Sequence, residues 1–193
     1  MTAQKPDRRV QRTRQLLHEA LISLILEKGY DRISVQDIVD RANVGRSTFY
    51  DHYQDKDDLL VSDLEVFHGQ LEPAEDGREI RDVLLSSLHV FQHAQENYRL
   101  YKALLGGDGI NLILRTSQKQ LSDEVLLRLK GHTAAGQLEV VPPKILANHL
   151  SSSLLSLLTW WLDHDMPYSP QEMEEMYQQL VKPGVDSILT DTW

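Results

Sequence analysis

The stretch from residue 34 to residue 53, SVQDIVDRANVGRSTFYDHY, constrains the fold more than any other part of the chain. Ser34 can cap a short helix, and Asp37 three residues later has the spacing of a capping box. An apolar stripe with helical spacing follows, formed by Val35, Ile38 and Val39. Asn43 comes where the chain must turn, and Asn tolerates the left-handed backbone conformation well. The stretch therefore predicts two short helices joined by a tight turn.

The second of these helices is expected to run from Arg46 to about Tyr53, with Gly45 as its cap and Val44 filling the angle between the helices. It is too short to hold a hydrophobic core, and it carries Arg, Ser, Thr, Tyr and His. Guanidinium and hydroxyl groups suit the phosphates and base edges of DNA. We therefore expect this helix to be presented to a partner, while Phe49 and Tyr53 lie in the core.

The run ISVQDIVDRANVGRSTFYDHYQDKDDLL resembles the N-terminal DNA-binding domain of the TetR family of bacterial transcriptional regulators. The resemblance covers about residues 10–65. It combines the turn, the sequence TFY at 48–50, an aromatic at 53 and the start of the next helix at Lys56. Asn43 stands where Gly is frequent in the family, and Gly45 stands where Ser often caps. Both departures concern the strength of the caps.

The resemblance also implies which side chains contact DNA. Arg46 begins the second helix and is a candidate for bidentate contact with guanine. Ser34 can offer a backbone N–H to a phosphate. Asp51 is expected to be a solvated or ion-paired acid, because a carboxylate repels phosphate. The candidate DNA contacts are Arg8, Arg9, Arg12, Ser34, Val44, Gly45, Arg46, Ser47, Thr48, Tyr50, His52 and Lys56.

The net charge of −9 is unevenly distributed. Residues 1–60 contain ten Lys or Arg and ten Asp or Glu, so the whole acidic excess lies in residues 61–193. Within the first 14 residues, Asp7 is the only acid, and the cations are Lys5, Arg8, Arg9, Arg12 and Arg14. This basic arm is expected to contact the DNA backbone. The alternative, a merely solvated charged terminus, stays open.

Composition narrows the remaining classes of protein. The chain has no cysteine, which excludes disulfides and thiol chemistry and fits a reducing compartment. No run of 18 apolar residues occurs, so no membrane span is expected. The first residues, MTAQKPDRR, lack the apolar segment of a secretion signal. These features predict a cytoplasmic protein with no membrane partner.

The rest of the chain has a helical pattern. Leu17, Ala20, Leu21, Leu24 and Ile25 predict the buried face of a first helix, 8–28, and Asp55 can cap a fourth helix that reaches about residue 71. The acid-rich EPAEDG at 72–77 predicts a boundary between a DNA-binding domain, 1–71, and a regulatory and dimerisation domain, 72–193. Later helices are expected at 78–95, 97–105, 110–130 with Gly131 as its end, 143–164, and from Pro170 to about Leu189, with a break or kink at Pro183-Gly184 near the end of this last helix.

The sequence thus predicts an all-α protein of about nine helices. A three-helix helix-turn-helix domain would precede a larger helical domain that binds a ligand and dimerises. The segment LLTWWLDHDMPYSPQEMEEM resembles the C-terminal regulatory domain of a TetR subgroup common in Gram-positive bacteria. That resemblance implies dimerisation through the last two long helices, for which the candidates are Leu150, Leu154, Leu157, Leu158, Met173 and Tyr177. It also implies a ligand pocket, for which the candidates are Phe67, His89, Gln92, Tyr98, Tyr101, Trp160 and His164.

Metal and catalytic sites are not expected. His89 and His93 have the four-residue spacing that chelation needs, but no Cys and no HExxH pattern accompany them, so pocket or surface positions are favoured. The turn at 106–109, GGDG, lacks the Lys-Ser/Thr of a phosphate-binding loop and is expected to end a helix. No catalytic constellation occurs, so neither an enzyme nor a cofactor is expected.

These expectations define a homodimeric regulator of transcription, a ligand-responsive repressor that binds a palindromic operator in double-stranded DNA. Its effector is expected to be a small hydrophobic molecule. The alternative is a protein-binding coactivator on the same fold without a small ligand, and a helical enzyme is a weaker third. A salt-sensitive gel shift would separate the first from the third, and co-purification of a protein partner would favour the coactivator.

Overall fold

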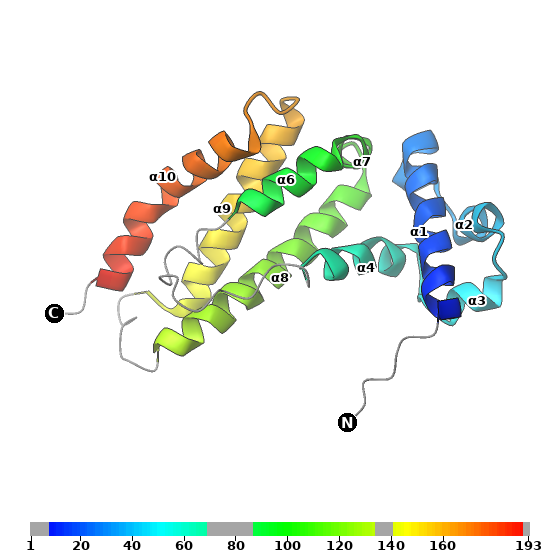
Figure 1. Ribbon diagram of the computed structural model, residues 1–193, viewed down its shortest axis with the longest axis horizontal. Helices are drawn as coiled ribbons and strands as arrows, with labels where there is room; N and C mark the ends of the chain where they lie inside the picture. The colour runs from blue at the N-terminus through cyan, green and yellow to red at the C-terminus, as the bar shows by residue number, and fades with distance from the viewer. Residues whose placement is uncertain (1–7, 69–86, 134–140, 191–193) are drawn as a thin grey trace. The chain divides into compact units, whose positions relative to one another are not determined.

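The computed structural model describes residues 8–68, 87–133 and 141–190, and all regular structure in these ranges is helical (Figure 1). The elements are α1 (Arg8–Lys28), the 3-10 turn η1 (Tyr30–Arg32), α2 (Val35–Ala42), α3 (Arg46–Tyr50), α4 (Lys56–His68), α6 (Leu88–Glu96), α7 (Tyr98–Leu104), α8 (Asp108–Thr133), α9 (Pro143–Asp163) and α10 (Pro170–Thr190). The predicted all-α fold is confirmed. Among the helices of these ranges, none is long and apolar enough to cross a membrane.

The chain divides into two compact units. The first comprises residues 1–70 and 99–113, and the second comprises residues 71–98 and 114–193. Helix α8 therefore begins in the first unit and continues into the second. The boundary predicted at 72–77 lies outside the described residues. The first unit takes in 99–113, which the sequence assigns to the second domain.

The core of the first unit is built where α1 packs against α2 and α4. The predicted buried face of α1 is confirmed, since its five residues are all buried: Leu17, Ala20, Leu21, Leu24 and Ile25. Ile38 of α2, Phe49 of α3 and Leu59 of α4 are each 0% exposed. The helix-turn-helix is therefore fixed by apolar packing on its inner side, which leaves its polar side to solvent.

A polar cluster also joins three parts of the first unit. His18 of α1 places its Nε2 3.2 Å from the Tyr53 hydroxyl and 3.1 Å from the Ser62 hydroxyl of α4. The Ser62 hydroxyl also donates to the Leu59 carbonyl at 2.8 Å. Tyr53 is buried, as predicted. The segment that follows the second helix of the helix-turn-helix is thereby tied to α1 and α4.

In the second unit, α9 and α10 lie side by side and α6 packs against α10 (Figure 1). Phe91 of α6 meets Trp161 of α9 edge-to-face at 5.6 Å, and both side chains are fully buried. The Trp161 indole N–H donates to the Tyr168 carbonyl, and the Tyr177 hydroxyl donates to the Leu150 carbonyl. The polar groups of Trp161 and Tyr177 thus both have partners within the unit.

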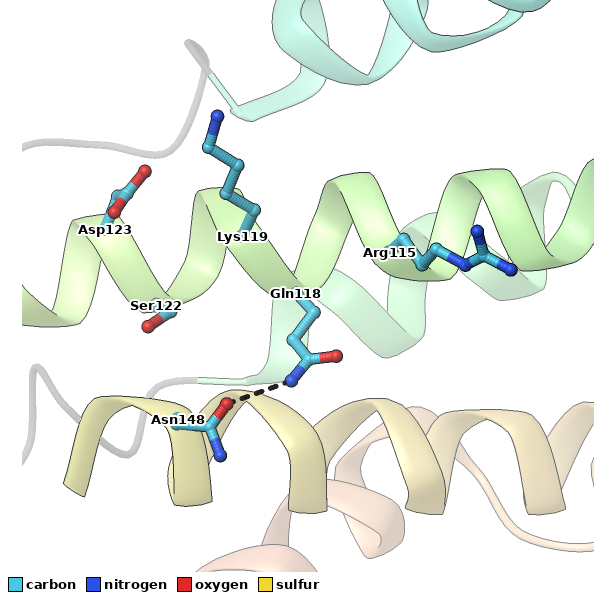
Figure 2. Close-up of a pocket in the computed structure, with 6 residues that line it drawn as sticks. All are labelled: Arg115, Gln118, Lys119, Ser122, Asp123 and Asn148. Carbon is cyan, nitrogen blue, oxygen red and sulfur yellow. Dashed lines mark hydrogen bonds between the residues drawn. The ribbon is translucent and has the colours of Figure 1, made fainter. Parts of the chain in front are cut away.

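A shallow polar groove of about 280 Å³ lies between α8 and α9 (Figure 2). Across it, the Gln118 amide donates to Asn148 Oδ1 at 3.1 Å and to Ser152 Oγ at 2.9 Å. The other lining residues are Arg115, Lys119, Ser122 and Asp123. In Figure 2, Lys119 and Asp123 point away from α9, so the charged side chains do not converge on one point.

One predicted helix end is wrong, because Gly131 lies inside α8, which continues to Thr133 instead of ending at 130. The last helix ends where it was expected, since α10 continues to Thr190. Pro183 lies inside α10, so of the two predicted outcomes, a break or a kink, a break does not occur. Pro183 removes one donor from the carbonyl of Gln179, but both residues are exposed, so water can satisfy that carbonyl. The predicted capping box at the start of α10 is confirmed, with Ser169 and Glu172 exchanging hydrogen bonds.

Candidate nucleic-acid interface

The turn between α2 and α3 has the predicted geometry. Asn43 ends α2 in the left-handed conformation, with φ 51° and ψ 47°. The N–H of Val44 donates to the Val39 carbonyl at 3.0 Å, which closes the turn. Gly45 is the N-cap of α3 in an extended conformation, with φ −65° and ψ 144°. Because the turn is fixed by backbone hydrogen bonds, the direction of α3 relative to α2 is set locally.

Helix α3 is shorter than predicted, since it ends at Tyr50 and the chain turns before Tyr53. Phe49 is fully buried, and its ring lies 5.9 Å from the Tyr53 ring, which holds the inner side of α3 in the core. On the outer side, Arg46, Ser47 and Tyr50 are exposed. The helix therefore buries one aromatic side chain on its inner side and presents polar side chains to a partner on its outer side.

Arg46 and Tyr50 interact on that outer face. The guanidinium lies over the Tyr50 ring, 5.8 Å from its centre, and Nη2 approaches the phenol oxygen to 3.5 Å. Both side chains are exposed, so the contact is weak, yet it restricts the rotamers that Arg46 can adopt. Tyr50 thus orients Arg46, a role that the sequence analysis missed although the i, i+4 spacing signals it.

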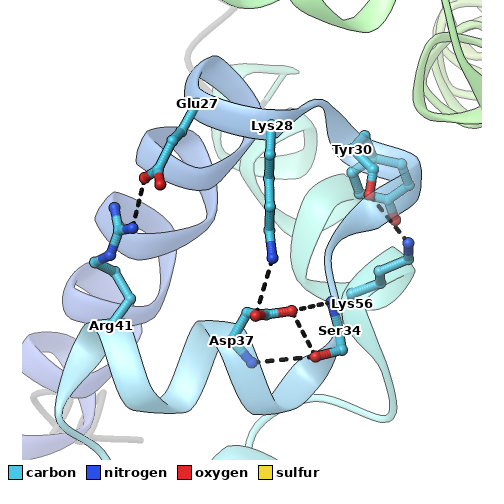
Figure 3. Close-up of polar contacts among 7 residues, drawn as sticks. All are labelled: Glu27, Lys28, Tyr30, Ser34, Asp37, Arg41 and Lys56. Carbon is cyan, nitrogen blue, oxygen red and sulfur yellow. Dashed lines mark hydrogen bonds and ion pairs between the residues drawn. The ribbon is translucent and has the colours of Figure 1, made fainter.

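The start of α2 is built around Asp37 (Figure 3). The backbone N–H and the hydroxyl of Ser34 both donate to Asp37 Oδ2, and the N–H of Asp37 donates back to the Ser34 hydroxyl. The predicted capping box is therefore confirmed. Lys28, at the end of α1, forms an ion pair with Asp37 at 2.9 Å. The backbone N–H and the hydroxyl of Ser34 both donate to Asp37, so the N–H that Ser34 was expected to offer to a phosphate is already engaged within the protein.

These contacts predict a pH dependence of stability. The hydrogen bonds from Ser34, and then Lys28, hold the pKa of the Asp37 carboxyl well below its ordinary value. The Asp37 carboxylate therefore binds a proton more readily in the unfolded chain than in the folded protein. The contribution of Asp37 is fully present above the ordinary Asp pKa of about 3.9 and is lost as the pH falls through the folded-state pKa.

The variant Asp37→Asn should therefore differ most from the wild type at neutral pH and least in strong acid. Urea unfolding of both proteins at several pH values measures that difference. Asp40→Asn on the same helix is the matched control, since the Asp40 carboxylate contacts the neutral amide of Gln36. A difference for Asp37→Asn that stays constant from neutral to acid pH would contradict the prediction.

Lys56, the candidate phosphate contact at the start of α4, is held by Tyr30. Its ammonium donates to the Tyr30 carbonyl at 3.1 Å and lies 4.3 Å from the centre of the Tyr30 ring. The Tyr30 hydroxyl donates to Asp57, and burial together with this hydrogen bond raises the pKa of Tyr30 above its ordinary value. Lys56 has three donors, so two are left for phosphate oxygens.

The remaining DNA candidates also belong to the first unit. Arg8, Arg9 and Arg12 are exposed at the start of α1, while Lys5 lies outside the described residues. Val44, Thr48 and His52 are partly exposed around α3. Asp51 is exposed at the C-terminal end of α3, as expected of a surface acid. The assignment of individual DNA contacts stays a prediction.

The seven pocket candidates do not share one described cavity. The groove between α8 and α9 is lined by none of them. Tyr101 is buried, which raises the pKa of its hydroxyl to about 12. Trp160 and His164 stack on each other at 4.5 Å, and both are exposed. Tyr98 donates to Asp165 at 2.6 Å, and the side chain of Phe67 lies outside the described residues. Gln92 is exposed and His89 is partly exposed.

His89 and His93, the pair with the spacing for chelation, both lie on α6. Burial lowers the pKa of His93, which would leave a neutral imidazole. Within the described ranges, no group of three or more His, Asp or Glu side chains is arranged to hold a metal ion.

Five of the six candidate dimer residues are instead buried inside the protomer: Leu150, Leu154, Leu158, Met173 and Tyr177. Their side chains pack within the second unit, so they are not available to a second copy, and Leu157 is partly exposed. The large apolar side chains that α9 and the described part of α10, up to residue 188, expose are Ile145, Trp160 and Leu180. The sequence pattern located the helices but not their outward faces.

Comparison with known protein families gives two matches. The family described as "Bacterial regulatory proteins, tetR family" matches residues 17–62, which include the helix-turn-helix. The family described as "Transcriptional regulator C-terminal region" matches residues 83–183, more than half of the chain.

Two curated relatives come from Bacillus subtilis (strain 168). The HTH-type transcriptional regulator YxbF is 25% identical over 182 residues, 91% of this chain and 46% of that protein. The HTH-type transcriptional regulator YvdT is 33% identical over 75 residues, 35% of this chain and 39% of that protein. The chain thus matches less than half the length of either relative.

Solved structures agree with these matches. A TetR transcriptional regulator from Streptococcus agalactiae 2603V is 30% identical, with a TM-score of 0.62 over 91% of this chain and 96% of that one. A TetR-family regulator from Syntrophomonas wolfei has a TM-score of 0.70 over 94% of this chain and 99% of that one, at 21% identity, which supports the fold alone. With its turn, its exposed Arg46 and both family matches, the chain belongs to the TetR family of DNA-binding transcriptional regulators.

Proposed function

We propose that this regulator is a ligand-responsive repressor that binds a palindromic operator as a homodimer. The proposed binding to DNA is supported by the outer face of α3, where Arg46 is exposed and oriented by Tyr50. A guanidinium held at the first residue of such a helix suits the two major-groove acceptors of guanine. Lys56 and the basic residues at the start of α1 supply phosphate contacts, which position the protein without specifying sequence.

The homodimer is supported by the apolar surface of the last two long helices. Leu180 of α10 is 74% exposed and Ile145 of α9 is 59% exposed. Large apolar side chains at such exposure suit burial against a second copy. Two copies related by a two-fold axis would place their α3 helices in successive major grooves, so that the operator would repeat its half-site about one helical turn apart.

The ligand response rests on the chemistry of the second half of the chain. The acidic excess of residues 61–193 disfavours a strongly anionic effector, while the aromatic candidates suit a hydrophobic one. The solved neighbours include NalD, the secondary repressor of a multidrug efflux pump, and FadR, a regulator of fatty acid degradation. A ligand would weaken DNA binding only by preferring the conformation that binds DNA less well.

The base-reading role of Arg46 is tested in two steps. The wild-type protein first selects its preferred duplex from a random DNA pool, and the affinity of Arg46→Ala for that duplex is then measured. The variant should lose about 1–3 kcal/mol on the selected duplex and relax its preference at one base pair. Binding to random DNA should change much less, because the phosphate contacts remain. Equal losses on the selected and the random duplex would show that Arg46 contacts only the backbone.

The ligand response is tested on the same complex. Uncharged and weakly cationic aromatic compounds should release the duplex in a saturable manner, and a phosphorylated sugar should not. Saturable release by the phosphorylated sugar would contradict the proposed effector class. Release by no compound, together with a protein that co-purifies in fixed ratio, would favour the coactivator alternative.

A further inference from the structure

The first turn of α8 rests on η1, the turn that joins α1 to α2. The Asp31 carboxylate accepts a hydrogen bond from the backbone N–H of Asp108, with a distance of 3.0 Å to Oδ1. Asp108 is the first residue of α8, and Asp31 lies 77 residues earlier in the chain. Asp31 therefore supplies a cap to a helix that begins in another part of the sequence.

Two glycines allow this close approach. A Cβ atom on Gly107 would lie 2.5 Å from Asp31 Oδ2, and a Cβ atom on Gly109 would lie 2.9 Å from the Tyr30 ring. A side chain at 107 would displace the Asp31 carboxylate, and one at 109 would collide with the Tyr30 ring and with Leu104. A Cβ atom on Gly106, the neighbour of Gly107, would have no atom within 4 Å, so Gly106 takes no part in the contact.

The other side of η1 holds the start of α4. The Tyr30 carbonyl accepts from Lys56, the Tyr30 ring lies under the same ammonium, and the Tyr30 hydroxyl donates to Asp57. Tyr30 is 5% exposed, so it has little freedom to move independently of its neighbours. The adjacent residues Tyr30 and Asp31 thus hold the first turns of two helices, α4 and α8.

We propose that Asp31 is a positioning residue for DNA binding. Its carboxylate fixes the first turn of α8 to η1, and η1 in turn fixes Lys56 for contact with a phosphate. Since α8 continues from the first unit into the second, a change in α8 reaches Lys56 through Asp31 and Tyr30. This inference rests on the proposed DNA contact of Lys56.

The charge of Asp31 and its hydrogen bond act in opposite directions on DNA binding. Removal of a negative charge near DNA strengthens binding, whereas loss of the cap weakens it by releasing Lys56. Gly107→Ala leaves the charge in place and displaces the carboxylate. Asp31→Asn removes the charge and keeps an oxygen that can accept from Asp108. The two variants therefore separate the effect of the cap from the effect of the charge.

The test measures affinity for the duplex that the wild-type protein selects, at a temperature where every variant is folded. Gly107→Ala should weaken binding about fivefold, the equivalent of one helix cap, and Asp31→Ala should weaken it by that factor or slightly less, because it also removes a negative charge. Their double variant should be no weaker than Asp31→Ala alone, because both remove one contact. Asp31→Asn and the matched control Gly106→Ala should stay within about twofold of the wild type.

The salt dependence separates positioning from a merely structural role. In the wild-type background, Asp31→Ala should make the slope of log affinity against log salt shallower by about one, because one phosphate contact is lost. In the Lys56→Met background, Asp31→Ala should leave the slope unchanged. Wild-type affinity for folded Asp31→Ala, or additive losses in the double variant, would overturn the inference while leaving the proposed function intact. No preference of the wild type for any duplex would overturn both.

Discussion

Replacing Phe49 by alanine is expected to cost about 3–5 kcal/mol of the stability of the first unit. Phe49 is fully buried, and its ring contacts both Tyr50 and Tyr53 edge-on or tilted. It is the one buried side chain of α3, a helix of five residues that no isolated peptide of this length could maintain. Because total stabilities of domains are about 5–15 kcal/mol, the loss removes a large part of what holds the helix-turn-helix.

Urea unfolding followed by circular dichroism measures this loss, and DNA binding should fall in parallel. Tyr50→Ala is the matched control, since Tyr50 is the next residue of the same helix and is 49% exposed. It should change stability by less than about 1 kcal/mol, as is usual for surface positions. Near-equal stability losses for the two variants would show that the Phe49 ring does not anchor α3.

The features of the fold that the sequence predicted are those decided within a few residues. The Ser34–Asp37 and Ser169–Glu172 capping boxes each connect residues three apart. The left-handed conformation of Asn43 likewise depends only on the turn in which it lies. The buried stripe of α1 follows from its 3.6-residue period. The helix-turn-helix could therefore be predicted without knowledge of the rest of the chain.

Contacts between distant residues had no such signal. The Asp31 cap of α8 joins residues 77 apart, and the Lys28–Asp37 ion pair joins the end of one helix to the start of another. The sequence analysis expected the GGDG turn only to end a helix, whereas it also seats α8 against η1. The candidate pocket likewise depended on aromatic residues whose directions are set by packing, and these directions place Trp160 and His164 at the surface.

The candidate dimer residues could not be assigned from the sequence for the same reason. An apolar stripe such as that of Leu150, Leu154 and Leu158 has the same pattern whether it faces the core of its own protomer or a second copy. Burial decides between these cases, and it assigns all three leucines to the protomer core. The outward residue Leu180 lies in the same pair of helices that the resemblance implied.

Replacing Leu180 by aspartate is therefore expected to abolish the proposed homodimer and to weaken operator binding by about 10²–10⁴-fold. Leu180 is 74% exposed, so the protomer can accept a carboxylate there without burying it. In a dimer, the same carboxylate would be buried against a second copy at a large desolvation cost. A monomer holds one half-site at a time and loses the effective concentration that links the two α3 helices.

Sedimentation velocity and operator binding measure the two effects on one preparation. Leu127→Asp on α8 is the matched control, because Leu127 is 70% exposed in the same unit but lies on neither of the last two helices. The control should remain a dimer, and the Leu180→Asp monomer should keep its affinity for random DNA per protomer, since its phosphate contacts are untouched. A stable Leu180→Asp dimer would place the interface elsewhere. A monomeric Leu127→Asp would place it on α8, where the exposed side of that helix would meet the partner.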